Sequence, residues 1–169
     1  GARIGPFKHH TNLLGGDKEL LTITQGRVLT PQNFYIPYYH MNKDVPRRGA
    51  FYAEKCVFDL LAEACLEKSA AQSFDSYFIH TGSWKILNGV CQLFGLPSNS
   101  AKASSSYKIL NQYANVSSCS IGFIMHDHFK NNSSPGRSLM VSFGAGFSGS
   151  AAILDYSKGK MQVELLRLQ

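Results

Sequence analysis

The sequence lacks a continuous apolar run of the length that a membrane-spanning helix needs. Such a helix takes about 18 or more apolar residues in a row, whereas the hydrophobic residues here, 44% of the 169, are divided into shorter stretches. The start of the chain also lacks the charged and apolar regions of a secretory signal peptide. We therefore expect a cytoplasmic protein with no membrane partner.

Charged side chains are scarce, at 17% of the residues against an average of about a quarter. This scarcity indicates a densely packed fold with much of its surface covered by something else. The net charge is +6, but the basic residues form no run, and the tightest group is Lys43, Arg47 and Arg48. That group is either a solvated surface or a site for a phosphate or an acidic carrier. We expect no nucleic-acid partner.

The cysteines lack the close pairing of a zinc site and the regular spacing of a disulfide framework. The four are Cys56, Cys65, Cys91 and Cys119. Because they lie in apolar or small-residue stretches, we predict reduced cysteines in the core. His126 and His128 flank Asp127, but residues two apart on a helix point to different faces. We therefore predict no metal site there.

The length favours a single domain. Residues 1–19 show no hydrophobic period, so we predict a connecting segment there and the domain at 20–169. Two β-prone runs follow at 20–28 and 34–39, and Pro37 makes the second an edge or irregular stretch. Residues 48–68 have the helical period and form the longest predicted helix.

The second half of the chain alternates between the two kinds of element. A short buried strand at 76–79 ends at His80, and Ser83 can cap a helix that Gly95 ends. The remaining predicted elements are a β-prone run at 104–110, a helical run at 115–125, a loop at 131–136, and strands at 138–143, 151–156 and 161–166. This order predicts a mixed α/β fold with helices packed on its sheet.

Three loops at the ends of predicted elements carry residues that chemistry could use. They are Phe-Ile-His-Thr-Gly at 78–82, Gln-Tyr-Ala-Asn-Val-Ser-Ser at 112–118 and Ser-Phe-Gly-Ala-Gly-Phe at 142–147. A loop after a strand of an α/β sheet lies where ligands gather. A single histidine after a strand is more often structural, and a single Gly-x-Gly is a weaker signal still. The order and spacing of the three segments together carry the interpretation.

The stretch from Tyr77 to Leu154 resembles the C-terminal domain of ketoacyl-ACP synthase III and type III polyketide synthases, of the thiolase superfamily. His80 follows a strand and precedes a helix that ends near Gly95, Asn115 lies in the Tyr-Ala-Asn-Val-Ser-Ser segment, and residues 143–147 match a Phe-Gly-x-Gly loop. The resemblance implies the C-terminal half of a thiolase-like fold, an α/β class with helices packed on a mixed sheet.

The resemblance also implies a reaction. Enzymes of this family hold an acyl group on a cysteine, decarboxylate a malonyl thioester and let the resulting carbanion attack the acyl group. The implied catalytic residues are His80 and Asn115, which would donate hydrogen bonds to the enolate oxygen. The backbone N–H of Ala145 is implied as part of an oxyanion hole. The implied substrates are thioesters of CoA or acyl carrier protein, with no permanently bound cofactor.

This sequence departs from the family pattern at several positions. Residues 81–83, Thr-Gly-Ser, match neither Gln-Ala-Asn nor Pro-Gly-Gly, and Ala114 replaces the usual glycine before Asn115. The nucleophilic cysteine has no counterpart, and packing explains Cys119 better. The resemblance therefore implies an N-terminal half-domain or subunit that bears the cysteine, an isolated chain without activity, and a dimer. The alternative is a non-catalytic binding or assembly module with the same fold.

Overall fold

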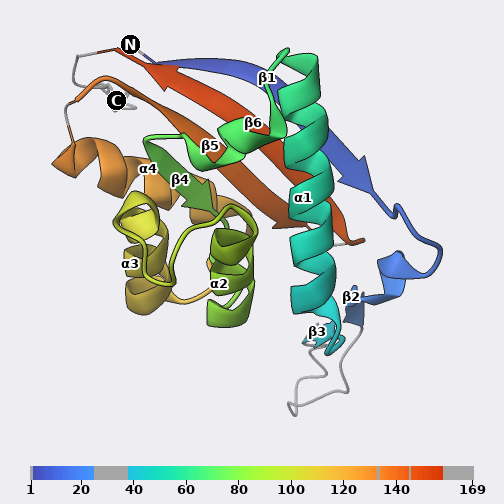
Figure 1. Ribbon diagram of the computed structural model, residues 1–169. Coiled ribbons are helices and arrows are strands. Elements are labelled where there is room, and N and C mark those ends of the chain that lie inside the picture. The colour runs from blue at the N-terminus through green and yellow to red at the C-terminus, as the bar shows by residue number, and fades with distance from the viewer. Residues whose placement is uncertain (1, 25–37, 133, 145, 158–169) are drawn as a thin grey trace, which may run out of the picture.

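The computed structural model describes residues 2–24, 38–132, 134–144 and 146–157 (Figure 1). A four-stranded mixed sheet has the order β1-β6-β5-β4, in which β4 runs parallel to β5 and the other neighbours are antiparallel. A two-stranded antiparallel sheet pairs β2 with β3. The strands are β1 (Ala2–Thr11), β2 (Leu21–Thr24), β3 (Tyr38–Met41), β4 (Ser76–Ile79), β5 (Gly136–Gly144) and β6 (Ser148–Tyr156).

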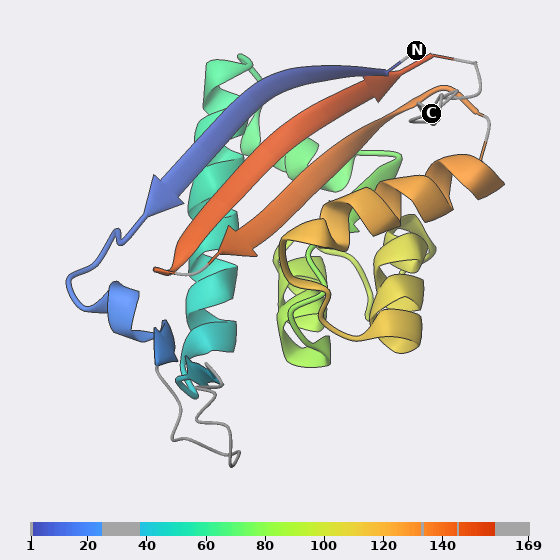
Figure 2. The same ribbon diagram turned by 180° about the vertical axis from the view of Figure 1, so that it is seen from behind.

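Helices pack on both faces of the larger sheet. The α-helices are α1 (Val45–Glu63), α2 (Trp84–Leu93), α3 (Ser104–Tyr113) and α4 (Ser120–Asn131). Short 3-10 helices are η1 (Asp17–Glu19), η2 (Lys68–Gln72), η3 (Ala101–Ala103) and η4 (Ser117–Cys119). Figure 1 shows α1 and α2 in front of the sheet, and Figure 2 shows α4 on the opposite side, close to β5. The fold class predicted from the sequence is confirmed.

The buried apolar residues form two clusters, one on each face of the larger sheet, because successive side chains of a strand point to opposite faces. Leu139 and Val141 of β5 belong to the larger cluster, which α1 and α2 cover, and Met140 between them packs into the smaller cluster. Successive residues of a strand point to opposite faces. The smaller cluster contains Phe78 of β4 and Ile124 of α4, so α4 closes the second face at the β4 side of the sheet.

Several elements predicted from local sequence signals are present in the structure. The strand at 76–79 is β4. The side chain of Ser83 accepts a hydrogen bond from the N–H of Ile86 at the start of α2, and Gly95 adopts φ +68° just after the end of that helix. The long helix predicted at 48–68 is α1, which begins and ends a few residues earlier, at Val45 and Glu63.

The prediction of a connecting segment at residues 1–19 is wrong, because Ala2–Thr11 form the edge strand β1. This strand pairs with β6 in a register that runs from Ala2 opposite Tyr156 to Thr11 opposite Ser148. All of its residues are partly or fully exposed, so the strand shows no buried apolar face that the sequence could mark. Backbone pairing with a distant strand makes it a strand, so part of the segment predicted to be a connection belongs to the larger sheet.

The β-prone run at 104–110 is also wrong as a strand, because these residues form most of α3. Ser106, Ile109 and Leu110 lie at helical spacing and are buried.

Cys56 and Cys91 are buried as predicted, but Cys65 and Cys119 are exposed; all four are free. The turn at 158–159 and the strand at 161–166 lie outside the described residues, and so do residues 25–37, which include parts of the two β-prone runs at 20–28 and 34–39. Within the described ranges, no helix is both long enough and apolar enough to cross a membrane.

Candidate active site

His80 lies at the carboxyl end of β4, directly beside β5. Its backbone N–H donates a 2.9 Å hydrogen bond to the carbonyl of Val141, so the parallel pairing of the two strands continues to the histidine. The rings of His80 and Phe143 meet edge to face, with centroids 6.3 Å apart. The sheet therefore places this imidazole next to the strand that leads into the glycine loop.

Asn115 reaches the same place from the loop between α3 and η4. Its side-chain amide donates a long hydrogen bond of 3.4 Å to the carbonyl of Gly82, and its side-chain oxygen accepts one of 2.9 Å from the N–H of Ser117. The second bond, from residue i+2 to the side chain of residue i, is an Asx turn. It fixes which edge of the amide faces the histidine loop, while Asn115 itself remains exposed.

A small cavity of about 40 Å³ joins the two residues. Its lining consists of Leu21, Met41, Val45, Gly49, His80, Gly82, Ile86, Asn115, Phe143, Gly144 and Phe147. The structure thus brings His80 and Asn115 together beside the glycine loop. Ala145, the predicted source of an oxyanion-hole N–H, lies outside the described residues, so its role stays a prediction.

The imidazole of His80 is buried, with 7% of the residue exposed. Burial lowers its pKa below the ordinary value of 6.5, so the ring is neutral at pH 7. The Nδ1 atom is buried and has no hydrogen-bond partner among the described residues. Because an unpaired N–H is rarer in protein interiors than an under-used acceptor, this favours the tautomer that carries its hydrogen on Nε2. That nitrogen is then the donor available to a ligand.

Gly82 allows the histidine loop to pack tightly. A Cβ at this position would lie 2.9 Å from Cδ1 of Ile86, 3.3 Å from Cδ2 of His80 and 3.7 Å from its Nε2. An added Cβ would therefore force the end of the Ile86 side chain to move and would crowd the ring of His80. The carbonyl of the same glycine accepts the hydrogen bond from the Asn115 amide, so Gly82 lies between the two predicted catalytic residues.

The backbone before Asn115 is strained. Ala114 has φ 57° and ψ −145°, a conformation that glycine adopts freely and that costs other residues about 1–3 kcal/mol. The loop keeps it because the contacts on either side fix the path of the chain. The strain lies directly before the residue that faces His80.

The cavity lining contains no cysteine among the described residues. Cys119 is exposed and belongs to η4, so its predicted role in packing is wrong, and it does not line the cavity. His128 packs among Phe78, Phe129 and Tyr156. Within the described ranges, no group of three possible metal ligands occurs.

Sequence reasoning missed most of the cavity wall. Leu21, Met41, Val45 and Gly49 line it, although they precede the three motif segments by 29 residues or more along the chain. No motif marks them, because apolar residues in a strand and a helix look the same in any core.

Of the basic group Lys43, Arg47 and Arg48, Arg48 forms an ion pair of 3.1 Å with the buried Asp17, whereas Lys43 and Arg47 are exposed.

Comparisons with known proteins find a family model and relatives to which this chain is similar. A family model described as 3-oxoacyl-acyl-carrier-protein (ACP) synthase III C terminal matches residues 66–156, more than half of the chain. A beta-ketoacyl-(acyl-carrier-protein) synthase III of Acholeplasma laidlawii is 31% identical over 106 residues, 60% of this chain and 33% of that protein. A putative chalcone synthase of Bacillus subtilis is 31% identical over 85 residues, 49% of this chain and 23% of that protein.

Solved structures share the fold. The C-terminal type III polyketide synthase domain of Steely1 from Dictyostelium has a TM-score of 0.74 at 20% identity, over 91% of this chain and 40% of that one. The 1,3,6,8-tetrahydroxynaphthalene synthase of Streptomyces coelicolor has a TM-score of 0.75 at 16% identity, over 94% and 42%. This chain therefore spans about a third of the Acholeplasma laidlawii protein and about two fifths of each of these two solved chains.

Proposed function

The chain belongs to the family of 3-oxoacyl-ACP synthase III C-terminal domains, and we propose that it forms the C-terminal catalytic half of a condensing acyltransferase. The reaction is the decarboxylative Claisen condensation of a malonyl thioester with an acyl thioester. The observation that carries the proposal is the meeting of His80 and Asn115 at one cavity beside the glycine loop. Both side chains can offer N–H donors that bear no charge.

Neutral donors suit the intermediate of this reaction. When the malonyl thioester loses CO₂, the electron pair of the broken C–C bond moves into an enolate whose negative charge lies largely on the thioester oxygen. Nε2–H of His80 and the side-chain amide of Asn115 would donate hydrogen bonds to that oxygen, and the low polarity of the cavity strengthens both bonds. The carbanion then attacks the acyl thioester carbonyl, and the cysteine leaves as a thiolate.

We propose that an N-terminal half supplies this cysteine, either within a longer gene product or as a partner subunit. Two observations support the proposal. The lining of the cavity contains no cysteine among the described residues. The chain also spans only 33% of the ketoacyl synthase III of Acholeplasma laidlawii.

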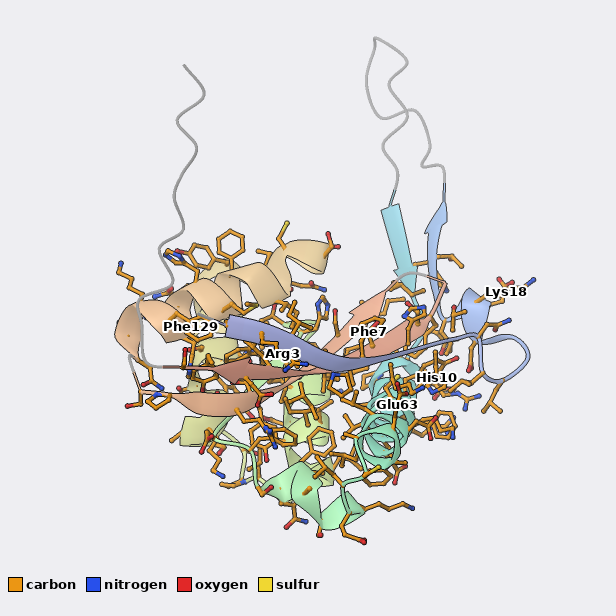
Figure 3. The ribbon with its side chains drawn as sticks, turned by 90° about the horizontal axis from the view of Figure 1, so that it is seen from above. Arg3, Phe7, His10, Lys18, Glu63 and Phe129 are labelled. Carbon is orange, nitrogen blue, oxygen red and sulfur yellow. The ribbon has the colours of Figure 1, made fainter. Side chains whose placement is uncertain are left out.

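The larger sheet has an apolar area that such a half would cover. Phe7, Ala152 and Met140 stand side by side in the strand register, so they share the face on which α4 lies. Ile4 and Phe7 are nevertheless 65% and 57% exposed. Figure 2 shows no helix of the described residues in front of β1, and Figure 3 shows Phe7 on the side of Phe129, with His10 and Glu63 on the α1 side. Ile4 and Phe7 therefore offer apolar contact area to such a half.

The proposed substrates are thioesters of CoA or acyl carrier protein, and the proposal requires no permanently bound cofactor. Lys43 and Arg47 are exposed and offer positive charge to a phosphate or an acidic carrier. The whole enzyme is proposed to be a dimer, as the family resemblance implies. These parts of the proposal concern the complete protein rather than the isolated chain.

The test measures CO₂ release and ketoacyl product for the 169-residue chain alone and for the chain combined with a cysteine-bearing N-terminal half. That half is the one encoded upstream of Gly1 or, failing that, the one from the Acholeplasma laidlawii relative. We expect activity only in the combination, and its loss when the cysteine of the added half is replaced by alanine. Cys119→Ala should leave the activity unchanged.

Two outcomes would contradict the proposal. Activity of the chain alone that Cys119→Ala abolishes would show that the nucleophile lies in this chain. A complex that forms with the added half but neither decarboxylates nor condenses would favour the non-catalytic assembly module instead.

A further inference from the structure

Two buried hydroxyl groups join the histidine loop to the asparagine loop. Thr81 directly follows His80, and Ser120 is the first residue of α4. Both residues are fully buried, and their Oγ atoms lie 3.0 Å apart. Thr81 is one of the residues that depart from the family pattern, and no sequence motif marks Ser120.

The direction of this hydrogen bond follows from the number of hydrogens. The hydroxyl of Ser120 donates a 2.7 Å hydrogen bond to the carbonyl of Ser117. A serine hydroxyl has one hydrogen but can accept further bonds. The Thr81 hydroxyl is therefore the donor in the 3.0 Å contact, and Ser120 Oγ is its acceptor.

The connection continues from Ser117 to the predicted catalytic amide. The N–H of Ser117 donates a 2.9 Å hydrogen bond to the side-chain oxygen of Asn115, whose amide nitrogen donates to the carbonyl of Gly82. Gly82 directly follows Thr81, so the contacts form a closed circuit. Its two sides are the segment that carries His80 and the segment that carries Asn115.

Asn115 depends on such support, because the residue is exposed and its own hydrogen bond to the histidine loop, to the Gly82 carbonyl, is long at 3.4 Å. The backbone on both sides is in unfavourable conformations, with φ 57° at Ala114 and φ 54° at Ser117. Strained residues persist only where surrounding contacts fix them. The buried Ser120 hydroxyl, bonded to the Ser117 carbonyl, is such a contact.

We propose that Thr81 and Ser120 are positioning residues whose hydroxyl bridge sets the separation of His80 and Asn115. The consequence for catalysis rests on the proposed function, whereas the consequence for the geometry of Asn115 does not. A displacement of about 1 Å in a reacting group can cost about a hundredfold in rate. The bridge would therefore act on the decarboxylation step through the two donors, without touching the substrate.

The first experiment follows the Asn115 side-chain amide by NMR in the 169-residue chain. Thr81→Val keeps the shape of the side chain but removes the donor, and Ser120→Ala removes both bonds of the second hydroxyl. We expect each change to shift the amide signals of Asn115 and to increase their mobility, whereas Thr81→Ser should keep the parental signals. Ser138→Ala is the control, since Ser138 is a fully buried hydroxyl on β5 that bonds to Ser76 and Tyr156 instead.

The second experiment uses the enzyme assembled with its cysteine-bearing half. Thr81→Val should lower the rate constant of malonyl decarboxylation about 10- to 100-fold, with little change in the KM for the malonyl thioester or in acylation of the cysteine. Thr81→Ser should restore the rate. A purely structural role would instead lower all steps together through loss of folded protein, as Ser138→Ala would do.

The proposal is wrong if folded Thr81→Val and Ser120→Ala proteins keep the parental Asn115 amide signals, or if their decarboxylation falls no more than that of Ser138→Ala. If Thr81→Val does not fold, Ser120→Ala decides by the same two measurements. An assembled parental enzyme without any activity would overturn the proposed function. The NMR measurement would still decide whether the bridge positions Asn115.

Discussion

The hydroxyl of Tyr52 donates a 2.9 Å hydrogen bond to the carboxylate of Asp17, which is only 2% exposed. The same hydroxyl accepts a 2.6 Å hydrogen bond from the N–H of Leu13. Burial raises the pKa of the Tyr52 phenol, so the group stays protonated and can donate. The contact fastens the segment after β1 to α1.

Removing this hydroxyl should destabilise the fold. Tyr52→Phe leaves the buried Asp17 carboxylate without one donor and the Leu13 N–H without its acceptor, which should lower the free energy of unfolding by about 1–3 kcal/mol. Urea unfolding of the chain measures the change. Tyr113→Phe is the matched control, because Tyr113 is 54% exposed and should lose almost nothing. Equal losses in the two variants would contradict the assigned role of the Asp17 contact.

The fold could be predicted where the signal is local. Ser83 and Gly95 bound α2 because a capping side chain and a left-handed glycine act within one turn. The strand β1 could not be predicted, because it is ordered by pairing with β6, some 140 residues away in the sequence. Residues 104–110 were assigned wrongly because propensity is weaker than packing, and α3 buries Ile109 and Leu110 at helical spacing.

Gly149 of β6 should not tolerate a side chain. A Cβ there would lie 2.9 Å from Cβ of Tyr52 and 3.3 Å from Sγ of Cys56, both on α1. Gly149→Ala must therefore push α1 away from the sheet, at about 1–3 kcal/mol of stability. Gly89→Ala is the control, since nothing lies within 4 Å of its added Cβ in α2 and alanine should stabilise that helix by about 0.5–1 kcal/mol. Thermal or urea unfolding should thus give opposite signs for the two changes.

Ala114→Gly should stabilise the chain, although glycine usually destabilises. The φ of 57° and ψ of −145° at Ala114 suit glycine, so the substitution relieves part of a strain of about 1–3 kcal/mol, offset by the greater freedom of glycine in the unfolded chain. Ala62→Gly, at an exposed position in the last turn of α1, should instead cost up to about 1 kcal/mol. If the two variants unfold at the same reduced denaturant concentration, the strain at Ala114 is not real.

The candidate site shows the same division between local and distant signals. His80 and Asn115 could be predicted because each lies in a motif with its own spacing, and the structure brings them to one cavity. The hydroxyl bridge between Thr81 and Ser120 could not, since 39 residues separate the two and serine and threonine occur in any loop. Polar contacts between loops depend on how the helices pack, and the sequence pattern does not contain that information.

Stability should rise with pH in the range below 6.5. Burial lowers the pKa of His80, and burial also lowers that of His128, so both rings are neutral in the folded chain at a pH where unfolded histidines are protonated. In that window the unfolded state binds more protons, and the free energy of unfolding increases with pH by up to about 1.4 kcal/mol per unit for each group. Above 6.5 these two residues contribute no further change.

Urea unfolding between pH 4.5 and 8 would measure this dependence, and NMR titration should give midpoints below 6.5 for both rings. The variant His80→Gln cannot be protonated and should show a shallower rise. A His80 midpoint above 6.5 would mean that the folded state favours the imidazolium. The proposal that a neutral ring donates to the enolate would then be wrong.

Independent measurements of acylation and decarboxylation in the assembled enzyme should distinguish the roles of the two proposed donors, His80 and Asn115. Asn115→Ala removes one donor to the enolate oxygen, which should slow malonyl decarboxylation about a hundred- to a thousandfold. Acylation of the cysteine uses the thiolate and backbone donors, so it should be affected far less. His80→Ala removes the other donor and should slow decarboxylation to a similar extent, and it should also slow acylation if the imidazole keeps the thiol ionised.

Asn115→Gln, which keeps the amide but moves it, serves as the control for geometry and should recover only part of the rate. Should Asn115→Ala block acylation while decarboxylation continues at the parental rate, the role assigned to Asn115 would be wrong, and the cavity would have to bind the acyl group rather than the malonyl thioester.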